Sequence, residues 1–436
     1  MFVSQSDRRR RQLLNAVFAL AACLSAPVAT HSQGLSALSL EDALRLAEQR
    51  SSRLTAQDAA ATAAREQEVA AGQLPDPILK AGINNLPVNG ADRFSLTSDF
   101  MTMRSVGVAQ ELTREAKRKA RASRFASEAE LALAARQVAL ADLRRNTALA
   151  WLDRYFQERT RAVLLAQRDE SALQVEAAQS SYRSGRGSQA DVFAARLAVA
   201  QIEDRLRQVD RQILMAGTTL SRWVGPDASL ELQSPPALTA IRLPAELLES
   251  ELLVHHPELS MLAQQERVAR AEADIAQSAR QTDVSVELMY SQRGPGYSNM
   301  LSFNVSIPLQ WDQAGRQDRE LAAKLAIVEQ RRAEREEAIR EHIAQTRGWL
   351  QGWQSSRDRV TVYDNTLLPL AAERTRAALT AYRGGVGPLS AVLEARRLEI
   401  DARMDRLRIE MEAGTYWAQL EYLIPPGHLP ATEQFK

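Results

Sequence analysis

The sequence predicts a mainly α-helical protein with a small membrane β part. Three observations predict it: long stretches with coiled-coil spacing, two pairs of alternating segments, and an order of elements that occurs twice. The 436 residues include only 5% aromatic side chains, and the mean hydropathy is −0.31. This profile is typical of long polar helices rather than of a compact enzyme. Lys and Arg (55) nearly balance Asp and Glu (54), which argues against a nucleic-acid partner.

The N-terminus has the features of an export signal. Arg8 to Arg11 are basic, Leu13 to Ala22 are apolar except for Asn15, and small residues follow. We therefore predict a signal peptide over residues 1–32. Leu20-Ala21-Ala22-Cys23 also resembles a lipobox, which would make Cys23 the lipidated first residue. The alternative is cleavage near residues 29–32 with loss of Cys23, and both interpretations stay open.

Short motifs indicate a tandem duplication. Tyr182-Arg183-Ser184-Gly185-Arg186-Gly187 recurs as Tyr382-Arg383-Gly384-Gly385-Val386-Gly387, at an offset of 200 residues. We expect a first repeat over 39–224, a Pro-rich connector over 225–244, a second repeat over 245–424 and a C-terminal tail over 425–436.

Each repeat is predicted to contain a helix, two strands, a long helix, a glycine turn and a returning helix. The predicted ranges are 39–74, 77–86, 100–111, 113–183 and 188–224, then 245–281, 283–293, 300–310, 313–383 and 388–424. Pro257 should interrupt the first helix of the second repeat, because proline lacks a donor and clashes with the preceding turn.

The returning helix of the first repeat carries a regular apolar seam. Its members step by threes and fours, which is the spacing of coiled-coil packing: Val192, Ala195, Val199, Ile202, Leu206, Val209, Ile213, Ala216, Leu220 and Trp223. At 1.5 Å per residue, helix 113–183 would extend about 105 Å. The sequence therefore predicts a rod that spans a distance.

The strands of the second repeat alternate clearly between apolar and polar residues. Each is about 11 residues long, enough to cross a bilayer at a tilt. The first-repeat strands alternate weakly, and their position in the repeat carries that prediction. The alternative is a hairpin that caps a soluble bundle, but a lone hairpin is marginal in water. Four strands cannot close a transmembrane barrel, and open edges in lipid leave backbone groups unpaired, so we expect the chain to oligomerise.

Several of these motifs resemble those of the TolC family of outer-membrane efflux proteins. The resemblance rests on the duplicated order of elements and on the two Tyr-Arg-x-Gly-x-Gly motifs at the predicted tips of the helical hairpins. It also rests on His256-Pro257-Glu258-Leu259. The segments Leu74 to Pro77 and Val108 to Arg121 are similar to the heavy-metal branch, the cobalt–zinc–cadmium and copper–silver outer-membrane factors.

The resemblance implies a homotrimer in outer-membrane lipid, with a 12-stranded barrel and a coiled-coil helical tunnel through the periplasm. It also implies two partners, a periplasmic adaptor and an inner-membrane pump of the resistance–nodulation–division type. Such a channel would export heavy-metal cations passively. The alternatives are a channel of this fold for drugs or type I secretion, and a periplasmic coiled-coil adaptor, which the duplicated unit disfavours.

The resemblance places adaptor docking at the two glycine turns. The matching residues are Arg183, Gly185, Arg186, Gly187 and Ser188, with Gly385, Val386, Gly387, Pro388, Leu389 and Ser390. Asp191 and Glu394 match acidic residues that form a tip gate and cation filter in the family. Each could instead be a solvated surface acid, and Asp191 could pair with Arg186.

Nothing in the sequence indicates catalysis, a cofactor or a resident metal. There is no nucleophile–base constellation, and acid–base catalysis needs a desolvated site. His255 and His256 are adjacent, so on a helix they would point about 100° apart, a poor chelate. A single Cys argues against a disulfide framework.

Overall fold

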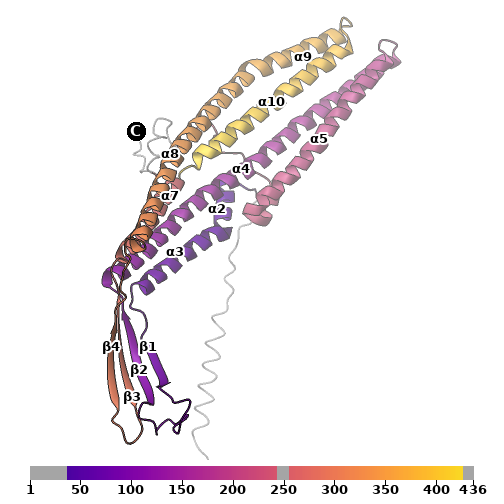
Figure 1. Cartoon of the computed structure of the whole chain (residues 1–436). Coiled ribbons are helices and arrows are strands. Elements are labelled where there is room, and N and C mark those ends of the chain that lie inside the picture. Colours follow the sequence, from indigo (N-terminus) through magenta and orange to yellow (C-terminus); the bar gives the residue numbers. More distant parts are fainter. Residues whose placement is uncertain (1–36, 243–254, 426–436) are drawn as a thin grey trace, which may run out of the picture.

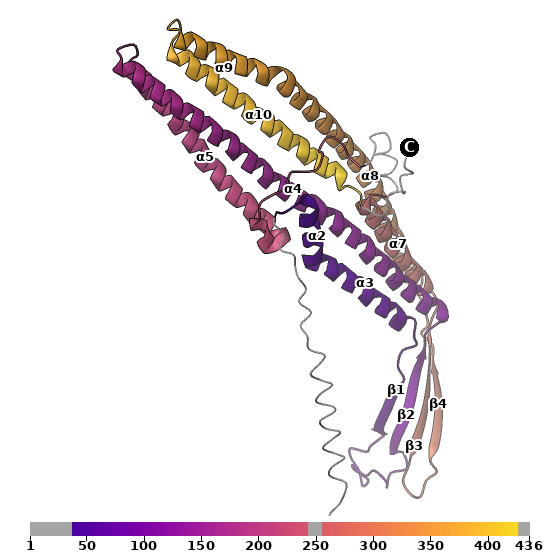
Figure 2. The same ribbon diagram turned by 180° about the vertical axis from the view of Figure 1, so that it is seen from behind.

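The computed structural model describes residues 37–242 and 255–425. The predicted signal peptide with Cys23, residues 243–254 and the tail from residue 426 lie outside these ranges. Figures 1 and 2 show an elongated molecule with a sheet at one end and two helical hairpins at the other. No helix of the described ranges is long and apolar enough to cross a membrane.

The elements follow the predicted order in both halves. The first half contains α2 (Leu40–Arg50), α3 (Ser52–Ala71), β1 (Ile78–Asn84), β2 (Met103–Leu112), α4 (Glu115–Arg183), α5 (Gln189–Val224) and the short helix η1 (Gly225–Ser229). The second contains α7 (Pro257–Ser278), β3 (Val284–Gln292), β4 (Met300–Ser306), α8 (Gln317–Val362), the π-helical turn η2 (Tyr363–Leu367), α9 (Leu368–Arg383) and α10 (Leu389–Glu421).

Two predicted helices are interrupted, which corrects the sequence prediction. The helix expected over 39–74 breaks at Ser51, whose side chain accepts a hydrogen bond from the Leu54 N–H and so starts a second helix. The helix expected over 313–383 begins at Gln317 and is interrupted by η2. The predicted interruption at Pro257 is confirmed, because Pro257 is the first residue of α7 and His256 its N-cap.

The helices pack through the predicted seam and through a larger core near the middle of the rod. Seven of the ten predicted seam residues of α5 are buried, and Val199, Ile213 and Trp223 are half-buried. The larger core surrounds Trp151, which is fully buried, and Trp417. Trp151 donates to the Leu38 carbonyl (3.2 Å) and Trp417 to the Ala240 carbonyl (2.8 Å). These bonds fix segments outside the long helices onto the core.

The four strands form one antiparallel sheet in the order β1-β2-β3-β4. The register places Val108 opposite Leu288, and Leu288 opposite Phe303. The weakly alternating first-repeat strands thus share one apolar face with the second-repeat strands, and Phe303 is 68% exposed on it. The other face is polar, with a Ser105–Ser291 hydroxyl hydrogen bond of 3.0 Å. Within the described chain, the outer edges of β1 and β4 have no strand partner.

Candidate functional site

The two glycine turns have the same backbone structure. Helix α4 ends at Arg183, and the N–H groups of Arg186 and Gly187 donate to the Ser181 carbonyl at 3.0 and 3.1 Å. In the second hairpin, the N–H groups of Val386 and Gly387 donate to the Ala381 carbonyl at 3.0 and 3.2 Å. The repeated motif therefore encodes one turn structure twice.

Backbone geometry explains why glycine occupies both repeated positions of each turn. Gly185 and Gly385 adopt φ values of 71° and 75°, a region that residues with a side chain rarely occupy. Gly187 and Gly387 lie close to the preceding helix, where a Cβ would lie 2.9 Å from the Ser181 hydroxyl or 3.1 Å from the Ala381 Cβ.

Most of the predicted docking residues lie on the surface of the tips. Val386 is 85% exposed, and Arg183, Arg186, Ser188, Pro388 and Ser390 are also exposed. Leu389 is different, because it is only 3% exposed and packs with Ala178, Val192, Ala195 and Val392 beneath the turns. Leu389 can therefore influence docking only by supporting the turn, and its cluster joins both hairpins.

Asp191 forms a helix cap in this structure. Its carboxylate accepts hydrogen bonds from the Ser188 N–H (3.0 Å) and hydroxyl (2.7 Å), and the Ser188 hydroxyl accepts from the Asp191 N–H (3.1 Å). These hydrogen bonds lower the pKa of Asp191, so the carboxylate stays ionised. Arg186 donates instead to the Ser184 hydroxyl (3.2 Å), so the Arg186–Asp191 pair is not formed within the chain.

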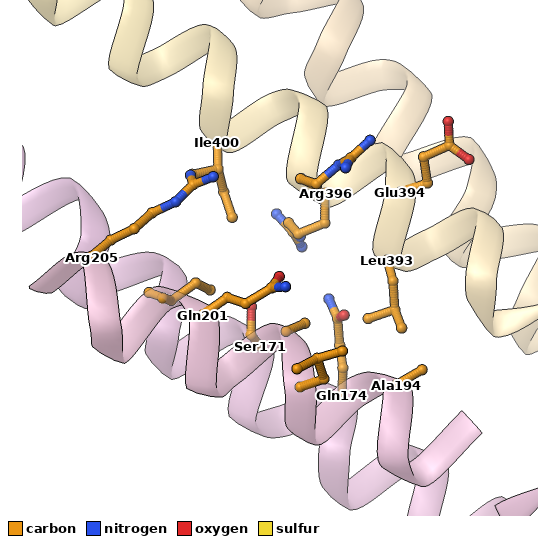
Figure 3. Close-up of a pocket in the computed structure, with 13 residues that line it drawn as sticks. Ser171, Gln174, Ala194, Gln201, Arg205, Leu393, Glu394, Arg396 and Ile400 are labelled. Carbon is orange, nitrogen blue, oxygen red and sulfur yellow. The ribbon is translucent and has the colours of Figure 1, made fainter. Parts of the chain in front are cut away.

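Glu394 lies on α10 at a pocket between the two hairpins (Figure 3). Glu394 pairs with Arg374 at 3.8 Å, and its side chain is 59% exposed. The pocket holds about 340 Å³ and is bounded by α4 and α5 on one side and α10 on the other. Asp191 does not line it, so the structure does not bring the two predicted gate residues together within one chain.

Polar residues that the sequence reasoning missed join the hairpins at this pocket. Gln174 is 8% exposed, lines the pocket and has a carbonyl oxygen without a hydrogen-bond partner. Nearby, Arg396 contacts Glu170 (2.6 Å) and the buried Glu399 (3.3 Å). Arg205 contacts Asp401 across the hairpins (3.0 Å). The i, i+3 spacing of Arg396 and Glu399 was a sequence signal for their ion pair. No sequence signal indicated the contacts between the two hairpins.

The described residues contain no group of three or more His, Cys, Asp and Glu side chains arranged to hold a metal ion. His256 is buried and packs against His342, with ring centroids 4.3 Å apart. Burial lowers the pKa of His256 to about 3, with the neighbouring His342 and Arg145 charges as further causes, so its imidazole is neutral at physiological pH.

Comparisons with known proteins agree with this geometry. Residues 248–424 match the model of the family described as outer membrane efflux protein. The comparison with curated proteins finds no match.

Solved outer-membrane channels share the fold over 88% of this chain. The outer membrane protein VceC of Vibrio cholerae superposes with a TM-score of 0.73 at 17% identity, covering 88% of this chain and 95% of that one. CusC superposes with a TM-score of 0.72 at 15% identity, covering 88% and 91%. The open state of the MtrE outer membrane channel of Neisseria gonorrhoeae gives 0.69 at 15% identity, covering 88% of each chain.

The solved structures and the family match point to the same fold. The described chain has the fold of outer-membrane efflux channels, and residues 248–424 are similar to the outer membrane efflux protein family. The family match lies in the second repeat, which carries Glu394 and the second glycine turn.

Proposed function

We propose that the protein is the outer-membrane channel of a tripartite efflux system and that it passes heavy-metal cations out of the cell passively. The observation that carries the channel assignment is the sheet register. It gathers most of the exposed apolar residues of the four strands on one face, including Leu79 (72% exposed) and Leu301 (71%). A face of this kind suits lipid, whereas the polar face suits a water-filled lumen.

The unpaired edges of β1 and β4 support a homotrimer. An edge strand in lipid leaves backbone groups without partners, each at a cost of several kcal/mol. Three chains of four strands give the 12-stranded barrel that the family resemblance implies, and each edge is then paired with a neighbouring copy.

The hairpin tips are proposed as the docking point for a periplasmic adaptor, which would connect the channel to an inner-membrane pump of the resistance–nodulation–division type. The exposed residues Arg183, Arg186 and Val386 and the rigid glycine turns support this role. Asp191 and Glu394 are proposed to act as the tip gate and cation filter, since ionised carboxylates near a three-fold axis favour cations.

The metal substrate rests on the segments that resemble the heavy-metal branch, Leu74 to Pro77 and Val108 to Arg121. In the structure these segments lead into β1 and out of β2. The alternative is a channel of the same fold that serves drug efflux or type I secretion.

Growth of a deletion strain tests the substrate. The strain and a complemented control are grown with Cu(I), Ag(I), Zn(II), Co(II), Cd(II) and a panel of drugs and dyes. We expect sensitivity that is confined to one metal group and is restored by the complementing gene. Sensitivity to drugs with normal metal tolerance would overturn the metal assignment and leave the channel fold intact.

A further inference from the structure

A second pocket lies near the middle of the rod, away from the tips and the sheet. It holds about 350 Å³ between the α2–α3 break, α4 and the end of α5. Its lining includes three arginines from two parts of the chain: Arg50 and Arg53 flank the break at Ser51, and Arg222 comes from the last turn of α5. None of these residues belongs to the proposed docking or gating machinery.

The Arg50 guanidinium is held by a close backbone approach. Gly225 has φ +74°, and a Cβ at this position would lie 2.6 Å from the Arg50 Cζ. The Arg50 guanidinium therefore packs against the chain where α5 ends. The structure shows no hydrogen bond or ion pair between Arg50 and any residue that it describes.

The other two guanidiniums are also positioned by their surroundings. The Arg222 guanidinium stacks over the ring of Trp223 at 4.6 Å from the centroid, and Trp223 also lines the pocket. Arg222 likewise has no ion pair among the described residues. Arg53 lies 3.7 Å from Asp142, and Asp142 is held more closely by Arg145 at 2.6 Å. Among the three pocket arginines, only Arg53 has a carboxylate partner in the described structure, and Arg145 holds that carboxylate more closely.

We propose that this pocket binds an oxyanion, a phosphate or a carboxylate. Guanidinium groups match both anions through paired N–H donors, and a partly enclosed pocket strengthens such bonds relative to open water. The Ser51 and Ser52 side chains, which also line the pocket, offer hydroxyl donors.

The position of the pocket separates it from the lipid surface. Its α4 residues, 139 to 146, lie about 40 Å along the helix from Glu115, at 1.5 Å per residue. A membrane headgroup at the sheet end of the rod would not reach it. The anion is therefore a soluble one, or a group on a polymer at the level of the middle of the rod.

Isothermal titration calorimetry on the purified full-length protein in a non-ionic detergent tests the site. Sodium phosphate is titrated in one arm and sodium citrate in the other, at an ionic strength held constant with sodium chloride. We expect saturable binding, with one site per chain, that weakens at least tenfold in the Arg50→Gln/Arg222→Gln variant. Binding in the phosphate arm alone assigns a phosphate ligand, binding in the citrate arm alone a carboxylate, and binding in both a general oxyanion site.

Two controls separate binding from folding and from general charge. Arg207→Gln removes an exposed arginine of α5 that forms no ion pair with the described residues, and this variant should bind as the wild type does. Arg50→Lys keeps the positive charge but loses the paired N–H donors of the guanidinium, so it should weaken binding several-fold. This variant replaces the double variant as the test if the double variant does not fold. Absence of saturable binding in both arms, or equal affinity in the wild type and the arginine variants, overturns the proposal.

Discussion

Arg406 of α10 forms a two-point ion pair with Asp364 of the π-helical turn η2, with N–O distances of 2.9 and 3.0 Å. The turn interrupts the second long helix, whereas α4 runs unbroken through the equivalent positions of the first hairpin. π-helical turns mark local irregularity and often lie at functional sites. The pair, together with Glu410 on Arg406, raises the pKa of Arg406 and fastens α10 to this turn.

Asp364→Asn should loosen the second hairpin. A partly exposed ion pair contributes at most about 1 kcal/mol, so hydrogen exchange over residues 363–383 should accelerate up to about fivefold. Asp358→Asn changes an exposed α8 residue that forms no ion pair with the described residues, and it should leave exchange unchanged. Equal protection in all three proteins would show that the pair does not hold the turn.

Replacement of Gly385 by alanine should impair the tip, whereas replacement of its neighbour Gly384 should not. Gly385 needs a positive φ, which costs about 1–2 kcal/mol for a residue with a side chain, while Gly384 has helical angles. We expect Gly385→Ala to reduce capture of the cognate adaptor and metal tolerance, and Gly384→Ala to match the wild type. Identical capture by both variants would argue against a docking role for this turn.

Cation selectivity should separate the two roles of Asp191. Asp191→Asn removes the charge, whereas Ser188→Ala weakens the cap, by about 1 kcal/mol, and keeps the charge. In planar bilayers, we expect a lower cation preference for Asp191→Asn and for Glu394→Gln, and an unchanged preference for Ser188→Ala. A loss of preference in Ser188→Ala alone would make Asp191 a structural cap and not a filter.

Acidification should destabilise the protein through His256. The pKa of His256 is lowered to about 3 in the folded protein and lies near 6.5 when unfolded, so the unfolded state binds more protons between these values. The free energy of unfolding should therefore fall as the pH drops below 6.5, by about 2 kcal/mol at pH 5. Thermal unfolding at pH 7.5 and 5.0 measures this loss, which His256→Phe should reduce. An equal loss in the variant would place the pH dependence elsewhere.

Sequence periodicity was sufficient for the order of the helices and for β3 and β4, but it did not predict the interruptions at Ser51 and at η2. The register of the strands was harder to predict from the sequence. Val106 and Val108 join the apolar face only because they pair with Tyr290 and Leu288 of the second repeat. The break at Ser51 had a local signal, a serine cap within a helical pattern.

The remaining features depend on contacts between distant segments. His256 and His342 meet only because α7 packs along α8, and the Arg396–Glu170 and Arg205–Asp401 contacts depend on how the hairpins lie together. No local pattern encodes them. The structural role of Asp191 was visible in the Ser-x-x-Asp spacing, but spacing alone does not exclude a role in the lumen.

The most direct test of the central claim is the location and native mass of the full-length protein. Membranes are separated on a density gradient, and the detergent-extracted protein is measured by native mass spectrometry. The account predicts extraction from the outer-membrane fraction as an assembly of three chains, because each chain leaves two sheet edges to be paired. Recovery as a soluble or inner-membrane monomer would contradict it.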